Sequence, residues 1–183
     1  MFFNQKVIPA ISNHQDLKRF LSLPLTYGIL MNFQLAQLED LVKLMKDQGK
    51  KVLIHSELIR GLTSDEFGAI YLIQTLKVDG IISSKPKVIE ICKKRKVLGI
   101  LRFFLKDSIS LTQSIELCQK SSPDFLEILP ATCGSIIEEI KAAVCSEILL
   151  GGLIRSKAQI RDCLAVGAIA VTTSNPDLWD FTS

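Results

Sequence analysis

The sequence has few of the residues that build metal centres or disulfide frameworks. Its five cysteines are an odd number, no two of them form a Cys-x-x-Cys pair, and only two histidines accompany them. This spacing favours neither a zinc site nor a set of disulfides, so no metal site is predicted. We expect most of the cysteines to act as small apolar residues on the inner faces of helices.

Long apolar runs are also missing. No such run approaches the ~18 residues that a membrane-spanning helix needs, and Met1 to Ile11 lacks the cationic start and apolar stretch of a signal peptide. We therefore expect a cytoplasmic protein with no membrane partner. Hydrophobic residues make up 48% and charged residues 22% of the 183 positions, which is typical of a globular chain. The net charge of +3 is mild, so any binding of nucleic acid depends on local clusters of charge.

The chain contains one repeated unit, in which a short apolar run is followed by a polar turn and an amphipathic segment, the pattern of βα units. The predicted strands are Val7–Ile11, Tyr27–Met31, Val52–Leu58, Gly80–Ser83, Val97–Phe104, Phe125–Leu129, Glu147–Ile154 and Ala168–Thr173. Such a series forms either an open doubly wound sheet or a closed barrel. The even, unbroken count favours an α/β fold of the (β/α)8 TIM type, because closure removes both sheet edges. One compact barrel domain is expected to span residues 1–183, with short loops.

Two segments predict a phosphate-sized anion site. In barrels of this kind, ligands bind at the C-terminal ends of the strands, and phosphate often binds the loops after strands seven and eight. Gly151 and Gly152 lie in the seventh predicted strand, where the missing side chains let backbone N–H groups approach a ligand. Thr173, Ser174 and Asn175 end the eighth strand and open a predicted helix. The alternative is that the glycines only form a turn and the hydroxyls only cap a helix.

Polar and charged side chains also occur at or near the ends of other predicted strands. These residues are His55, Glu57, Lys85, Arg102, Glu127 and Arg155. Because successive side chains of a strand point to opposite faces, His55 and Glu57 share one face of the third predicted strand. A charged group inside an apolar strand is costly unless it is paired, so Arg102 either forms an ion pair with one of the glutamates or helps to hold a polar ligand. The lysine after strand four and the arginine after strand seven are expected to help hold a phosphate.

Catalytic machinery is not evident. The sequence has no Ser/His/Asp spacing and no strand lysine placed to form a Schiff base. Glu57 and Glu127 as an acid/base pair would rest on spacing alone, which is a weak signal. We therefore expect a protein that is not an enzyme.

The densest basic run is Lys93, Lys94, Arg95 and Lys96, which precedes the fifth predicted strand. Its place before a strand puts it at the end of the barrel opposite the predicted anion site. Cations at a helix C-terminus are favoured by the helix dipole, by about 0.3 to 1 kcal/mol, so the run is either a solvated helix end or a contact for nucleic-acid phosphates.

Several of these segments, in this order, resemble the glycerol uptake operon antiterminator regulatory proteins. The segments are Ile8–Ile11, His55–Gly61, Ile81–Ser84, Arg102–Ser108, Pro123–Pro130, Gly151–Arg155 and Ala170–Asn175. The resemblance covers nearly the whole chain. It implies a small barrel with glycerol 3-phosphate as its effector and no cofactor. It also implies binding to the leader mRNA of glycerol-utilisation operons, which prevents premature transcription termination. RNA binding rests on the resemblance alone.

Two positions depart from the family pattern. Glu57 stands where aspartate is expected and lengthens the reach of the charge, and Ala131 follows Pro130 where glycine is expected. Both changes bear on effector preference. Two other functions stay open, namely a small barrel enzyme acting on a phosphorylated metabolite and an effector-gated protein partner without an RNA role. Self-association into a homo-oligomer is compatible with the sequence.

Overall fold

Short runs rich in Ile, Leu and Val form parallel strands that close into a barrel in the computed structural model, which describes residues 5–182 apart from the side chains of residues 134 and 135. The strands are β1 Val7–Ile11, β2 Tyr27–Leu30, β3 Lys51–His55, β4 Gly80–Ser83, β5 Leu98–Phe104, β6 Phe125–Leu129, β7 Glu147–Gly151 and β8 Ala170–Thr173. Each strand pairs with the next in the chain, and β8 pairs with β1. The predicted (β/α)8 barrel is confirmed.

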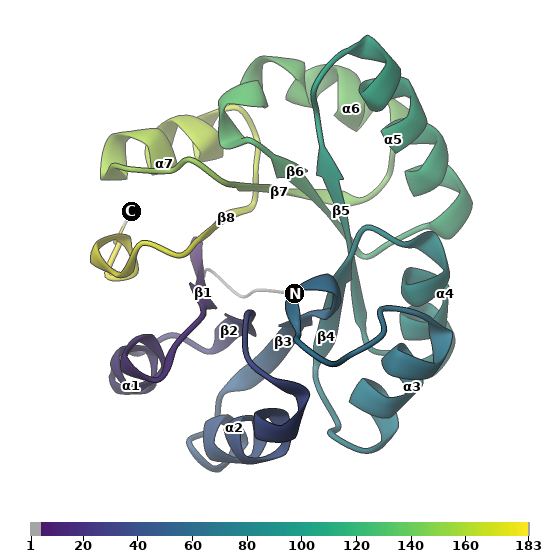
Figure 1. The fold of residues 1–183 in the computed structure, drawn as a ribbon. Helices are drawn as coiled ribbons and strands as arrows, with labels where there is room; N and C mark the ends of the chain where they lie inside the picture. The colour runs from purple at the N-terminus through teal and green to yellow at the C-terminus, as the bar shows by residue number, and fades with distance from the viewer. Residues whose placement is uncertain (1–4, 183) are drawn as a thin grey trace.

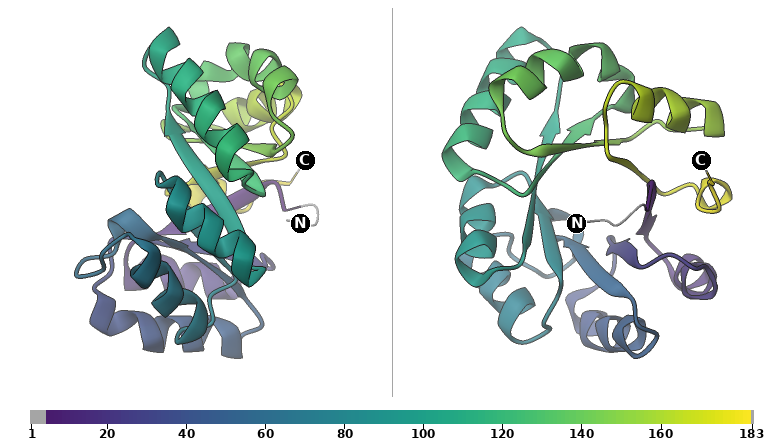
Figure 2. Two further views of the ribbon diagram at one scale, coloured as in Figure 1. Left: turned by 90° about the vertical axis from the view of Figure 1, so that its right-hand side faces the viewer. Right: turned by 180° about the vertical axis from the view of Figure 1, so that it is seen from behind.

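The helices surround the ring of strands (Figure 1). They are α1 His14–Ser22, α2 Leu35–Asp47, α3 Glu66–Gln74, α4 Pro86–Arg95, α5 Ser108–Ser121, α6 Ile137–Ala143 and α7 Lys157–Ala165, with short 3-10 helices η1 Ser56–Leu58, η2 Ala131–Ile136 and η3 Pro176–Leu178. Side chains of Asn13, Asp65, Asp107 and Ser156 cap the first turns of their helices by accepting backbone N–H groups. Only η3 follows β8, and it lies between α7 and α1, where an eighth helix would complete the ring (Figures 1 and 2).

Two apolar layers hold the barrel together. One lies between the strands and the helices, and Phe20, Leu38 and Met45 are fully buried in it. The other fills the inside of the barrel with side chains from every strand: Ile8, Tyr27, Ile29, Leu53, Ile82, Ile100, Phe125, Leu149 and Ala170. Burial of apolar area on both faces of the sheet is the main stabilising term in such a fold.

Three predicted strand boundaries are wrong by two or three residues, and three others differ from the structure by one residue. The third strand ends at His55 rather than at residue 58, because the chain turns into η1. The seventh ends at Gly151, because Gly152 (φ 76°) and Leu153 (φ 59°) adopt left-handed conformations that strands do not contain. The eighth begins at Ala170, because the residues just before it still belong to the turn that ends α7.

Residues 5–182 contain neither a helix able to span a membrane nor a group of side chains placed to hold a metal ion. No helix within residues 5–182 combines the length and the apolar character needed to cross a bilayer. Within the same range, no group of three or more His, Cys, Asp or Glu side chains is placed to hold a metal ion.

Candidate functional site

The inside of the barrel changes from apolar to polar near its top, which is the end at which the strands finish. Along several strands the inward-facing residue becomes polar two positions further on, as the strand period requires. The steps are Leu53 to His55, Ile100 to Arg102, Phe125 to Glu127 and Ala170 to Thr172. The alternation of side chains along the strands therefore places a polar layer directly above the apolar layer that fills the inside of the barrel.

His55 and Arg102 form the first contact of this layer. Nη1 of Arg102 donates a hydrogen bond to Nε2 of His55, and His55 is 5% exposed. Burial, together with the positive charge of Arg102, lowers the pKa of His55 to about 4. The ring is therefore neutral near pH 7, and because Nε2 accepts a hydrogen bond its proton is assigned to Nδ1. Nδ1 faces Oε2 of Glu57 at 3.4 Å.

Glu57 lies on η1, not on the third strand as predicted. Its Oε1 accepts hydrogen bonds from Oγ of Ser83 (2.6 Å) and from the backbone N–H of Ser84 (2.9 Å). Burial alone would raise the pKa of Glu57, but the hydrogen bonds from Ser83 and Ser84 outweigh it, so the pKa is lowered. Glu57 thus carries a negative charge that orients His55 from outside the polar layer.

Glu127 is 3% exposed and lies beside Arg102 on the neighbouring strand. Oγ1 of Thr172 donates a hydrogen bond of 2.6 Å to Oε1 of Glu127, and Nε of Arg102 lies 3.5 Å from Oε2. Burial raises the pKa of Glu127, while Arg102 and Thr172 oppose that rise. Gly151 makes room for this arrangement, because a Cβ there would lie 2.2 Å from Oγ1 of Thr172.

Three buried polar atoms of this layer make no hydrogen bond within the described part of the chain. They are Nδ1 of His55, Nε of Arg102 and Oε2 of Glu127. Buried polar atoms are nearly always paired in folded proteins, so three unpaired atoms in one place mark this layer as exceptional. All three residues line a cavity of about 170 Å³ at the top of the barrel.

The loops after β7 and β8 form the other side of this cavity. It is lined there by Gly152, Thr173, Ser174 and Asn175. These residues lie together in the structure, and binding of an anion by them stays a prediction. A short helix follows β8 from Pro176 with Asn175 as its N-cap, as predicted, and it is the three-residue η3. A turn this short has no useful helix dipole, and Pro176 has no N–H. The anion donors available here are therefore hydroxyls and loop N–H groups.

Other predicted residues lie outside the cavity. Nζ of Lys85 donates to the backbone carbonyl of Ser64 at 2.6 Å, and Arg155 is exposed on the loop before α7. Neither residue lines the cavity, and nor do Gly151 and Glu57, which lie beneath and beside it. The basic residues 93–96 are exposed on the last turn of α4 and just beyond it, below the start of β5. The structure therefore places this run at the end of the barrel opposite the cavity.

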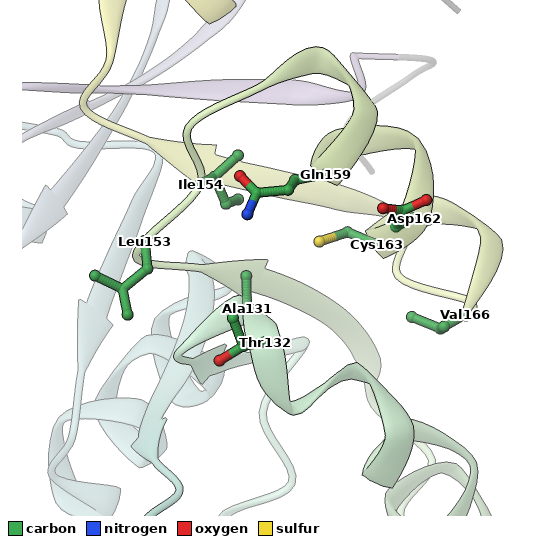
Figure 3. Close-up of a pocket in the computed structure, with 8 residues that line it drawn as sticks. All are labelled: Ala131, Thr132, Leu153, Ile154, Gln159, Asp162, Cys163 and Val166. Carbon is green, nitrogen blue, oxygen red and sulfur yellow. The ribbon is translucent and has the colours of Figure 1, made fainter.

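Sequence reasoning placed Thr172 at the end of the eighth strand without giving it a contact inside the barrel, and it missed a second cavity. Thr172 follows Ala170 by two positions, so the strand period held the signal that it faces inward. The second cavity, of about 300 Å³, lies between α7 and η2 (Figure 3). It is lined by Ala131, Thr132, Leu153, Ile154, Gln159, Asp162, Cys163 and Val166. Leu153 and Ile154 border both cavities, and nothing in the local sequence pattern signals this.

The closed barrel and its polar upper cavity define a small TIM-barrel protein with a polar cavity at the C-terminal ends of its strands. Comparison with known proteins is more specific. Residues 7–179 match the family described as glycerol-3-phosphate responsive antiterminator, and the chain belongs to this family. The resemblance found in the sequence is confirmed, and the chain is grouped with regulators of transcription that act by antitermination in glycerol metabolism.

Solved structures agree with this assignment. The chain is similar to a glycerol uptake operon antiterminator regulatory protein from Listeria monocytogenes, with 38% identity, a TM-score of 0.94 and coverage of 98% of this chain and 97% of the other. It is also similar to a glycerol uptake operon antiterminator-related protein from Thermotoga maritima, with 25% identity, a TM-score of 0.83 and coverage of 99% and 100%. An uncharacterised Escherichia coli protein, YgcP, is 25% identical over 173 residues, which are 94% of this chain and 91% of that protein.

Proposed function

We propose that this chain is a cytoplasmic regulator that binds glycerol 3-phosphate and then binds the leader mRNA of glycerol-utilisation operons, preventing premature termination of transcription. Family membership supports the effector and the regulatory role. The observation that carries the effector site is a cavity at the top of the barrel lined by His55, Arg102 and Glu127, each of which also holds a buried polar atom without a hydrogen bond.

The chemistry of these residues suits a polyol. The cavity is lined by Arg102, whose guanidinium carries N–H donors, by Glu127, whose carboxylate is an acceptor, and by the neutral ring of His55. A hydroxyl donates one hydrogen bond and accepts others, so the hydroxyls of the glycerol part can satisfy donors and acceptor together. The phosphate is then placed at the open side of the cavity, against the loop at Gly152 and the hydroxyls of Thr173 and Ser174.

A barrel enzyme acting on a phosphorylated metabolite is the alternative. The observation that favours it is the pair of shifted pKa values, that of His55 lowered and that of Glu127 raised, because active sites often hold such pairs. Regulation is the better proposal, because residues 7–179 match the antiterminator family.

The test is retention of labelled leader RNA on filters by the wild-type chain, with and without glycerol 3-phosphate. Glycerol alone and inorganic phosphate serve as controls, since each offers one half of the effector. We expect tighter RNA binding with glycerol 3-phosphate than with either half. Equal RNA binding in all four conditions would contradict the proposal, and turnover of glycerol 3-phosphate in the same samples would favour the enzyme.

The predicted RNA contacts Lys93, Lys94, Arg95 and Lys96 stay a proposal. All four side chains are exposed, so they are accessible to RNA phosphates. Electrostatic attraction between cationic side chains and RNA phosphates depends on the salt concentration and not on the base sequence. The run shares no residue with the cavity, so it does not by itself explain why the effector would change RNA affinity.

A further inference from the structure

The side chain of Arg102 reaches from the inside of the barrel to its surface. Inside, it contacts His55 and Glu127 in the polar layer. Outside, its guanidinium carbon lies 5.0 Å from the ring centroid of Phe104, two residues further along β5. Phe104 is 54% exposed. One arginine therefore joins the candidate effector cavity to an exposed ring.

Phe104 lies among other exposed groups at the top of the barrel. Lys106 follows it on the loop after β5, and Leu153 (61% exposed) and Arg155 lie on the loop after β7. The two loops flank the end of β6, to which both are tied by backbone hydrogen bonds, from Leu105 to Leu129 and from Ala131 to Gly152. We name the exposed residues Phe104, Lys106, Leu153 and Arg155 the rim patch.

The composition of the rim patch fits unpaired RNA bases better than a protein surface. An exposed ring with a guanidinium stacked on it is the platform on which proteins stack bases, and neighbouring cations hold the phosphates on either side. An apolar protein partner would account for the exposure of Phe104 and Leu153. It would not account for the cations at Lys106 and Arg155, which complement a polyanion.

We propose that the rim patch binds unpaired bases of the RNA with Phe104 as the stacking platform, and that the effector controls this contact through Arg102. The inference rests on the proposed function. A ligand that binds Arg102 at the cavity wall fixes the guanidinium, and the guanidinium in turn fixes the ring that stacks on it. The effector then favours one orientation of Phe104, and the two binding events stabilise each other by the same factor.

The test compares Phe104→Leu, which keeps an apolar side chain but loses the stacking face, with Phe104→Trp, which keeps it. RNA affinity is measured for each chain with and without glycerol 3-phosphate, and effector affinity is measured without RNA by calorimetry. We expect Phe104→Leu to lose about tenfold of RNA affinity with effector present, within the range for one stacked base, and little without it. Phe104→Trp should bind RNA like the wild type. Both variants should bind the effector, since Phe104 does not line the cavity.

A matched comparison uses a chain in which Lys93, Lys94, Arg95 and Lys96 are changed to glutamine. If that run supplies only electrostatic attraction to RNA phosphates, its loss lowers RNA affinity by the same factor with and without effector. Phe104→Leu, in contrast, removes the gain in RNA affinity that the effector produces.

Three outcomes overturn the proposal. The first is a Phe104→Leu chain that binds RNA as tightly as the wild type in the presence of effector. The second is an equal loss in the Leu and Trp variants, which means that stacking plays no part. The third is a change in self-association of Phe104→Leu with RNA affinity intact, which assigns the patch to contacts between copies of the chain. A wild-type chain that binds effector but never RNA overturns the proposed function instead, and this inference with it.

Discussion

Arg102 and Glu127 are register partners on β5 and β6, and their side chains approach to 3.5 Å between Nε and Oε2 without forming a hydrogen bond. An optimised buried ion pair would be closer and would use both guanidinium edges, since desolvation of two charges is otherwise not repaid. The loose geometry leaves Nε of Arg102 and Oε2 of Glu127 buried without a hydrogen bond, at some cost to stability.

Replacing Arg102 by alanine should lower the affinity for glycerol 3-phosphate by more than tenfold, because the ligand loses a charged donor in a buried site. Arg102→Lys should recover only part of the affinity, since an ammonium lacks the planar fork. Calorimetry of each variant gives the comparison, with Arg161→Ala, exposed on α7, as the control. Loss of folding with unchanged affinity per folded molecule would instead show that the arginine is a structural ion-pair residue.

Gly152 and Gly49 offer a matched pair for the loop after β7. Both have positive φ, 76° and 71°, so alanine strains each backbone by about 1–2 kcal/mol. A Cβ at Gly49 meets no atom within 4 Å, whereas one at Gly152 lies 3.2 Å from Cδ2 of Leu129 at the cavity wall. We expect similar losses of thermal stability and weaker effector binding only for Gly152→Ala. Equal effector affinities in the two variants would remove the loop from the binding site, and sulfate soaked into crystals should then bind elsewhere.

Stability should fall with acid because of His55. The pKa of His55 is lowered to about 4 in the folded chain from 6.5 in the unfolded chain, so folding favours the neutral ring. The stabilisation is present above pH 6.5 and is lost as the pH falls from 6.5 towards 4. At 1.36 kcal/mol per unit, about 2 kcal/mol is lost between pH 7 and pH 5. Urea unfolding at both pH values should show a smaller loss for His55→Gln, which does not titrate, and an identical loss would argue against a buried neutral His55.

Trp179 supports the loop that carries Thr173. It is 1% exposed, and its Nε1 donates a 3.0 Å hydrogen bond to the backbone carbonyl of Thr173. Trp179→Phe should lower the free energy of unfolding by about 1–2 kcal/mol, since it leaves that buried carbonyl unpaired. It should also weaken effector binding, because Thr173 and Ser174 line the cavity. Circular dichroism is the right probe, because Trp179 is the only tryptophan of the chain. Unchanged stability would mean that water replaces the indole at no cost.

Much of the site was predictable because it follows from local periodicity. Hydrophobic runs alternating with amphipathic segments identified the strands and the barrel, and the period of two placed His55, Arg102 and Glu127 on the inward face near the top. The ends of β7 and β8 mark Gly152 and the Thr173–Asn175 segment as a candidate ligand site. Each of these features depends only on residue types and short spacings, so the sequence alone determined them.

Only the tertiary structure decided which of these groups contact one another. His55 and Arg102 are 47 residues apart, and whether they meet depends on strand register and barrel closure, which no local pattern encodes. The same applies to Glu57, which moves onto η1 and bonds Ser83 and Ser84, and to Lys85, which folds back on Ser64. The length of each side chain and the residues that face it in the closed barrel determine these contacts. A polar group that is buried when the barrel closes needs a hydrogen-bond partner, and that partner comes from residues distant in the sequence.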